Sequence, residues 1–123
     1  MTPFGDRMRK LRAERGVTLK EMADAIGVSS AYLSALEHGK RGRPSWHLIQ
    51  RILNFFNIIW DEAEEVVRLA RISHPRITID TSGLSPKATE LANRLADDIG
   101  RLDAATLDEM LSALEKKRGK AKV

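Results

Sequence analysis

Apolar residues in the first half of the chain recur every three or four positions, which is the period of helices with one buried face. Most of these runs are preceded by Thr, Ser or Asp, the residues that favour helix starts, and several are followed by Gly, which favours helix ends. The pattern predicts five short helices, over residues 4–15, 18–27, 29–39, 45–56 and 61–75. Either Ser29 or Ser30 is expected to cap the third, and Asp61 the fifth.

The pattern changes after Pro75. Residues 76–81 alternate between apolar and polar for a few positions, as a short β-strand does. Two amphipathic helices follow, over 85–100 and 103–118, with Gly100 ending the first and Asp103 starting the second. We therefore expect an all-α protein with a five-helix domain over 1–75, a C-terminal helical hairpin over 76–118, at most one short strand between them, and a disordered basic tail over 119–123.

Residues 19–38 hold the most informative pattern, two short helices joined by a glycine turn. Ala23 is small enough to let the two helices cross closely. Gly27 can adopt the left-handed backbone conformation that a three-residue turn needs, and Val28 fills the angle between the helices. These features predict a helix-turn-helix, in which the second helix enters the major groove of DNA.

The segment TLKEMADAIGVSSAYLSALEHGKRGRPS resembles the DNA-binding domain of the lambda-type phage repressor and Cro family, also called the XRE family. The resemblance covers roughly residues 5–60 and includes LRAERG in the first helix. It implies a compact bundle of about five helices, in which Arg12 pairs with Glu37 to tie the first helix to the third. It also implies that DNA is contacted by the start of the second helix, the N-terminal part of the third and the loop that follows.

One residue departs from the family pattern. The family often has glutamine at the position of Leu19, where it bonds a phosphate, and leucine cannot make that bond. Lys20 is the expected substitute. The residues expected to contact DNA are Thr18, Lys20, Ser29, Ser30, Ala31, Tyr32, Ser34, Ala35, Lys40, Arg41 and Arg43.

The third helix is predicted to turn Leu33 and Leu36 inward and its small residues outward. The outward face carries no Arg, Gln or Asn, so the paired hydrogen bonds that read guanine or adenine are missing and direct base readout should be modest. Tyr32 has two open roles, packing against the second helix or the loop, or contact with DNA. The loop cations either contact phosphates or are merely solvated.

Three other residues have expected structural roles. His38 is expected to cap the third helix, with a weak contact to DNA as the alternative. Trp46 and Trp60 are expected to pack in the core or between subdomains, not to stack on bases.

Charge separates the chain into basic and acidic stretches. Residues 1–60 carry ten Lys and Arg against five Asp and Glu, residues 61–115 carry six against twelve, and the last eight residues carry five cations and no acid. A basic first half suits a polyanion such as DNA. The chain has no cysteine, which excludes disulfides and thiolate metal sites, and it has no apolar run of membrane-spanning length. A cytoplasmic, nucleoid-associated protein without a signal peptide is expected.

The sequence lacks the usual signatures of an enzyme. There is no glycine-rich phosphate loop and no nucleophile motif, and the three histidines lack metal-ligand spacing. We therefore expect no catalytic activity, no cofactor and no metal, and no small-molecule ligand is evident. The expected function is that of a transcriptional regulator, most simply a repressor, whose partners are double-stranded DNA and a second copy of itself.

The C-terminal helices carry apolar stripes that a lone hairpin would leave partly exposed to water. We expect them to form the interface of a homodimer that binds a two-fold operator, with the strand at 77–81 pairing with its symmetry mate. The expected interface residues are Ile77, Ile79, Leu84, Leu91, Leu95, Ile99, Leu107, Met110, Leu111 and Leu114. Two alternatives stay open: the hairpin folds back on the fifth helix, or it captures another protein, as in an antitoxin.

Overall fold

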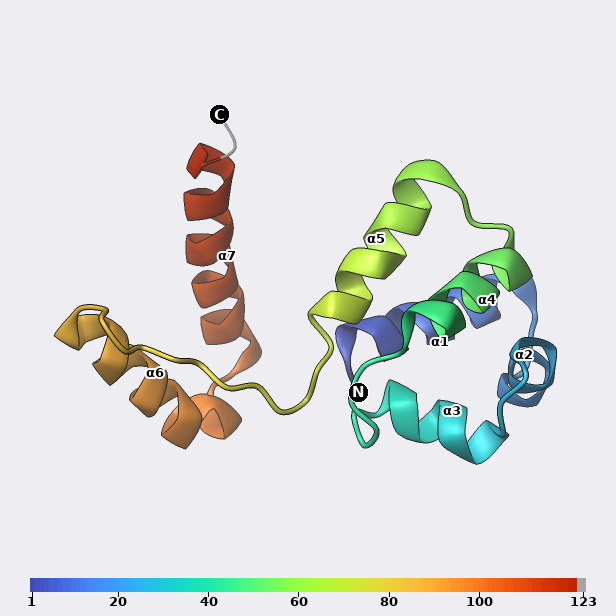
Figure 1. The fold of residues 1–123 in the computed structure, drawn as a ribbon, viewed down its shortest axis with the longest axis horizontal. Helices are drawn as coiled ribbons and strands as arrows, with labels where there is room; N and C mark the ends of the chain where they lie inside the picture. The colour runs from blue at the N-terminus through green and yellow to red at the C-terminus, as the bar shows by residue number, and fades with distance from the viewer. Residues whose placement is uncertain (122–123) are drawn as a thin grey trace. The chain divides into compact units, whose positions relative to one another are not determined.

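Helices account for nearly all the regular structure of the chain in the computed structural model, which describes the backbone of residues 1–121 and the side chains of 1–119. The chain divides into a first unit, residues 1–77, and a second unit, residues 78–123 (Figure 1). The elements are α1 (Pro3–Arg15), α2 (Leu19–Ile26), α3 (Ser30–Glu37), α4 (Trp46–Phe56) and α5 (Trp60–Arg71), then α6 (Pro86–Asp98), the 3-10 turn η1 (Ile99–Arg101) and α7 (Ala104–Ala121). The expected all-α fold class is confirmed. Within the described residues, no helix is both long enough and apolar enough to cross a membrane.

Side-chain caps set the starts of the helices around the predicted turn. The Thr18 hydroxyl accepts the Glu21 N–H at 3.0 Å and the Glu21 carboxylate accepts the Thr18 N–H at 3.2 Å, so the capping box is formed. Ser29 caps α3, because its hydroxyl accepts the N–H of Tyr32 at 3.0 Å. Gly27 has a φ of 79°, the left-handed conformation that the turn requires.

The expected cap of the fifth helix is wrong. α5 begins at Trp60, after Ile59, which offers no capping side chain. Asp61 instead lies in the first turn, where a carboxylate interacts favourably with the positive end of the helix dipole.

The hydrophobic core of the first unit draws on all five of its helices and on the turn before α5. Its buried residues are Phe4, Met8, Leu11, Met22, Ala23, Ile26, Leu33, Leu36, Leu48, Ile49, Ile52, Phe56, Ile58, Val66 and Ala70. α3 contributes only Leu33 and Leu36 to this apolar core, so most of its surface is left for other contacts.

α1 approaches the C-terminal end of α3 more closely than a side chain would allow. A Cβ atom on Gly5 would lie 2.2 Å from the carbonyl oxygen of Glu37. The same carbonyl accepts both the backbone N–H and the hydroxyl of Thr2, at 3.0 Å and 3.2 Å. The start of α1 is therefore bonded to the last residue of α3.

A buried ion pair joins the same two helices further along. The Arg12 guanidinium donates two hydrogen bonds to the Glu37 carboxylate, at 2.5 Å and 3.0 Å, and lies 3.5 Å from the sulfur of Met22. The Arg12–Glu37 pairing that the family resemblance implies is confirmed.

The end of α5 is held against the start of α1 by Ser73. Its hydroxyl oxygen accepts the N–H of Phe4 at 2.9 Å and its hydroxyl donates to the carbonyl of Leu69 at 2.5 Å. Ser73 is buried, while Ile72 beside it is exposed. The inward position at the end of α5 therefore belongs to a residue that satisfies backbone groups.

The expectation that the two tryptophans pack in the core is also wrong. Trp60 is 82% exposed and has a positive φ of 55°, while Trp46 is 57% exposed. The buried positions just before Trp60 are occupied by Phe56 and Ile58. The indole of Trp60 lies in solvent beyond them.

The expected short strand after Pro75 does not form. No strand occurs in residues 1–121, and Ile77 and Ile79 are exposed in an extended segment. A strand needs a hydrogen-bonding neighbour, and alternation along the chain says nothing about whether one exists.

In the second unit, α6 and α7 meet at η1 and diverge from there, and no residue of α6 is buried (Figure 1). Gly100 lies within η1 and does not directly end α6. Asp103 starts α7 as expected, because its carboxylate accepts the N–H of Thr106 at 2.8 Å. The predicted basic tail begins inside α7, and residues 122 and 123 lie outside the described part of the chain.

Candidate nucleic-acid interface

α3 has one face in the core and one face turned outward. Leu33 and Leu36 are buried, at 0% and 1% exposure, as the helical wheel predicts. Ala31 and His38 are exposed, and Ser30, Tyr32, Ser34 and Ala35 are half-buried. No side chain predicted to contact DNA is buried, so small residues form a shallow, accessible face along this helix.

The starts of α2 and α3 bring further polar groups to the interface. Thr18 and Ser29 each cap a helix by accepting a backbone N–H, which leaves the hydroxyl hydrogen free to donate to an anion. Each helix start also carries a partial positive charge. Lys20 is exposed, whereas Leu19 is partly buried against the core, which explains why an apolar residue stands there.

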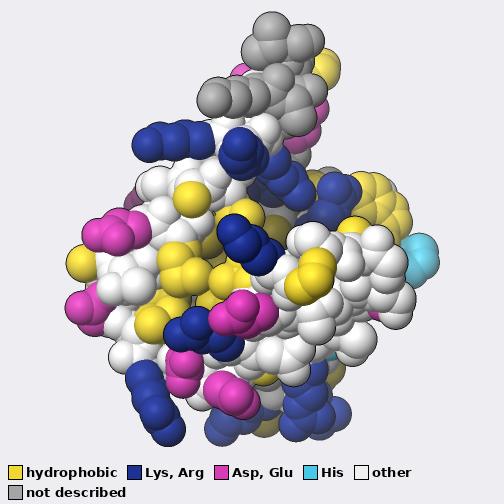
Figure 2. Space-filling view, turned by 90° about the vertical axis from the view of Figure 1, so that its left-hand side faces the viewer, with side chains coloured by type: hydrophobic (Ala, Val, Ile, Leu, Met, Phe, Trp, Pro, Cys, Tyr) yellow, Lys and Arg dark blue, Asp and Glu magenta, His cyan; other side chains and the backbone are white. Residues whose placement is uncertain are grey.

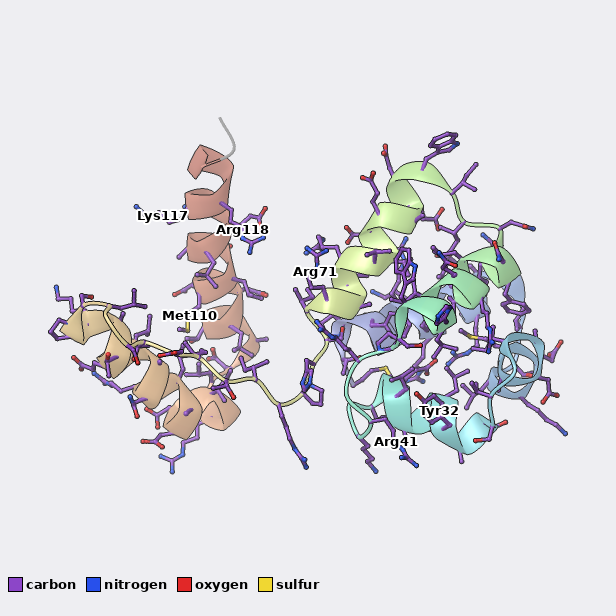
Figure 3. All side chains as sticks on the ribbon, in the orientation of Figure 1. Tyr32, Arg41, Arg71, Met110, Lys117 and Arg118 are labelled. Carbon is purple, nitrogen blue, oxygen red and sulfur yellow. The ribbon has the colours of Figure 1, made fainter. Side chains whose placement is uncertain are left out.

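The loop after α3 carries three exposed cations. They are Lys40, Arg41 and Arg43. The Arg41 guanidinium lies over the Tyr32 ring, 5.8 Å from its centroid, in a cation–π contact that holds this part of the loop against α3 (Figure 3). The packing role for Tyr32 is therefore confirmed, and a contact between its hydroxyl and DNA stays a prediction. Among the side chains described, no ion pair neutralises any of the three cations.

His38 closes α3, as expected. It is the C-cap residue, and its Nδ1 lies 2.8 Å from the carbonyl oxygen of Ser34. The ring satisfies a carbonyl that the end of a helix leaves without a partner.

The electrostatic balance of this face is positive. Residues 38–60 contain no Asp or Glu, and Glu37 is buried and paired with Arg12. The nearest acidic residues in sequence on the helix-turn-helix are Glu21 and Asp24 of α2, and both are exposed. The loop and the outward face of α3 can therefore meet a polyanion without a facing carboxylate of their own.

Sequence reasoning missed a cleft beside the loop. Trp46 lies at its edge, where α4 begins, and Arg71 at the end of α5 lines it as well. The cleft has a volume of about 340 Å³ and is lined by Arg43, Pro44, Ser45, Trp46, Ile49, Val67, Ala70 and Arg71. Trp46 follows directly on the basic loop and Pro44–Ser45, and that position was the available signal that it belongs with the loop and not with the core.

Among residues 78–119 of the second unit, none is buried. Seven of the residues expected at a dimer interface are exposed there or on the linker before it: Ile77, Ile79, Leu84, Leu91, Ile99, Leu111 and Leu114. The other three, Leu95, Leu107 and Met110, are half-buried, and Met110 lies on the side of α7 that faces α6 (Figure 3). Hydrophobic side chains gather on the face seen in Figure 2, with charged side chains around them.

Comparison with known proteins identifies the first unit. A family model described as a helix-turn-helix domain matches residues 3–66. The chain is 42% identical over 52 residues to an uncharacterized HTH-type transcriptional regulator, RghRB, of Bacillus subtilis, a match that covers 42% of this chain and 37% of that protein. It is 38% identical over 61 residues to the HTH-type transcriptional repressor RghR of the same organism, covering 50% and 45%.

Two further similarities are more distant. The HTH-type transcriptional regulator SinR of Bacillus subtilis is 33% identical over 49 residues, covering 40% of this chain and 44% of that protein. A solved structure, the SinR protein/SinI protein complex, aligns with a TM-score of 0.44 and 22% identity over 94% of this chain and 98% of that chain. The match to each of the three curated relatives spans less than half of the relative's length.

Proposed function

This chain belongs to the XRE-type helix-turn-helix family of DNA-binding transcriptional regulators, and on that premise we propose that it represses transcription as a homodimer on a two-fold DNA operator. The main support is the outward face of α3. This face is accessible along its length, its side chains are small, and it is bordered by a loop of three exposed cations that form no ion pair among the described side chains.

The residue types on this face suggest which of them provide affinity for DNA and which provide sequence specificity. Lys40, Arg41 and Arg43 bind phosphates, and the caps Thr18 and Ser29 add hydroxyl and helix-end contacts on the same side. Ala31 and Ala35 let α3 approach thymine methyl groups, and Ser30 and Ser34 bond base edges or sugar. Affinity therefore comes mostly from the backbone of the DNA, and part of the specificity comes from the shape of the groove.

The exposed apolar side chains of α6 and α7 support the dimer. A second copy would cover Leu91, Leu111 and Leu114, which are otherwise left in water. Two such helix pairs form a four-helix bundle, and the two-fold axis places one α3 at each half-site, about 34 Å apart on the DNA.

The same stripe supports a second function, capture of a different protein. A regulator that uses α6 and α7 in this way would be monomeric in isolation and would bind DNA through a single half-site. The oligomeric state of the full chain distinguishes the two.

Replacing Ala35 with Glu tests the DNA-binding proposal. The substitution places a carboxylate on the groove-facing side of α3, so binding to a duplex selected from a random pool should be abolished while the far-ultraviolet circular dichroism stays unchanged. Ala13→Glu is the matched control, because it adds the same charge at an exposed position of α1. Equal affinity of the two variants would contradict the assigned face.

A further inference from the structure

The linker that leaves the first unit begins beside the C-terminal end of α3. Gly39, the residue before the basic loop, has a φ of 78°, and a Cβ atom built on it would lie 3.2 Å from Thr2 and 3.4 Å from Pro75. Thr2 is itself bonded to the carbonyl of Glu37, the last residue of α3. Pro75 is therefore packed at the junction where α3 ends and the loop of Lys40, Arg41 and Arg43 begins.

Arg76 is the next residue after this contact. Its backbone N–H donates to Nδ1 of His74 at 3.1 Å, which closes a small turn, and its side chain is exposed. It lies within the first unit, which extends to Ile77, so its position beside the loop belongs to the same compact body as α3. No ion pair among the described side chains neutralises it.

The charge around this point has one sign. Residues 38–60 have no acid, and neither do residues 66–79. Residues 66–79 lie in a part of the chain whose net charge is negative, so that net charge does not show that this stretch has no acid. The Gly39–Pro75 contact brings these two acid-free stretches together at the end of α3, where a duplex bound to α3 would present its backbone.

We propose that Arg76 is a further DNA contact, binding a backbone phosphate that flanks the half-site read by α3. The linker then takes part in the complex, and the start of the second unit is fixed on the duplex when the first unit binds. The inference rests on the proposed function, since it adds a contact to the same DNA complex.

A contact between the Arg76 guanidinium and a phosphate releases counterions from the DNA, so the salt dependence of the DNA affinity measures that contact directly. The slope of log affinity against log salt is negative, and each lost phosphate contact makes it less steep by about 0.9, so a homodimer that loses one contact at each half-site should change by about 1.8. Binding of a labelled duplex of mixed sequence, measured from about 50 to about 200 mM salt, should show that reduction for Arg76→Ala and little of it for Arg76→Lys.

Arg68→Ala is the matched control. Arg68 is an exposed arginine of α5 whose guanidinium is bonded to Glu65 of the same helix, and it does not line the cleft beside the basic loop. Removing it changes the net charge by the same amount and should leave the slope close to that of the unmodified chain. Equal slopes for Arg76→Ala and Arg68→Ala would overturn the proposal.

A second measurement does not depend on charge. The chain has no cysteine, so Arg76→Cys and Arg68→Cys each provide one unique thiol for a photoactivated cross-linker. Cross-linking to the duplex is expected from position 76 and not from position 68. Equal yields at the two positions would overturn the linker contact, whereas absence of any salt-dependent binding by the unmodified chain would overturn the proposed function itself.

Discussion

Single residues at the junction of α1 and α3 hold α3 in place. Glu37 is 2% exposed and would be costly to bury as an isolated charge, but Arg12 supplies two hydrogen bonds to its carboxylate. Its carbonyl is bonded by Thr2 and closely approached by Gly5. The orientation of α3 therefore depends on one residue with three partners on α1 and the segment before it.

Removing Glu37 alone should destabilise the first unit more than removing both charges of the buried ion pair. Glu37→Ala leaves the Arg12 charge buried without a partner and should lower the free energy of unfolding of the first unit by about 3–5 kcal/mol, measured by hydrogen exchange of its core amides. The double variant Arg12→Met/Glu37→Met removes both charges and should recover part of that loss. Glu14→Ala, on the exposed side of α1, is the control; a loss as large there would count against the buried pair.

Gly5→Ala should destabilise, although alanine normally favours a helix. The added methyl group meets the Glu37 carbonyl and must push α1 away from α3, which should cost about 1–3 kcal/mol and weaken DNA binding. Gly119→Ala is the matched control, because nothing lies within 4 Å of that glycine in α7. Thermal denaturation of the two variants decides the matter, and equal shifts in the melting temperature would rule out the close approach.

These residues also mark where sequence reasoning stops. Glu37 could be assigned a partner because the family resemblance implies one. Gly5 carries no such signal, since a glycine in an early helical turn looks the same whether or not another helix lies against it. The role of Ser73 depends likewise on a contact 69 residues away in the chain.

Elements follow local rules closely where a cap and a turn residue act together. Thr18, Glu21 and Gly27 predict the bounds of α2, and Ser29 was one of two candidates for the cap of α3. The observed N-cap of α5 is Ile59, which has no capping side chain, so the pattern pointed to Asp61, two residues too late. The prediction of a strand at 77–81 is wrong for another reason. A strand forms only where a neighbouring segment pairs with it, and the pattern of the segment itself does not show whether such a neighbour exists.

Asp103 gives α7 a pH-dependent start. Hydrogen bonds from the Thr106 hydroxyl and backbone N–H hold the pKa of Asp103 below its usual value of 3.8. A lowered pKa in the folded state means that the cap stabilises α7 above pH 3.8 and is lost as the pH falls through the lowered pKa. The amide signal of Thr106, followed by NMR during an acid titration, should show this transition.

Asp103→Asn is the control for that titration. Asparagine also caps helices but has no carboxyl group to protonate, so the Thr106 amide should lose the transition while α7 is retained. A midpoint at or above the usual value in the unmodified chain would contradict the cap.

At the scale of the whole molecule, the two units differ in how they bury apolar side chains. The first has a core supplied by all of its helices, whereas α6 has no buried residue at all. The helical pattern in the sequence located the apolar faces of α1 to α4 and the apolar stripes of α6 and α7. It could not tell which faces would be covered within one chain, because periodicity shows which side of a helix is apolar and not what packs against that side.

Charged substitutions in the stripe should dissociate the proposed dimer. Leu91→Glu/Leu114→Glu adds two carboxylates to the exposed apolar face, so the full chain should sediment as a monomer and lose affinity for a two-fold operator. Asn93→Glu/Ser112→Glu adds the same charge on the same two helices outside the stripe and should remain dimeric. A monomeric unmodified chain would instead favour capture of a different protein.

The exposed tryptophans allow binding to the first unit to be followed by intrinsic fluorescence. The chain has only two, and Trp46 shares a cleft with Arg43 of the basic loop after α3, while Trp60 lies at the start of α5. Trp60→Phe leaves Trp46 as the sole indole emitter, so quenching or a spectral shift of its fluorescence would report occupancy of the loop without any dye attached to protein or nucleic acid.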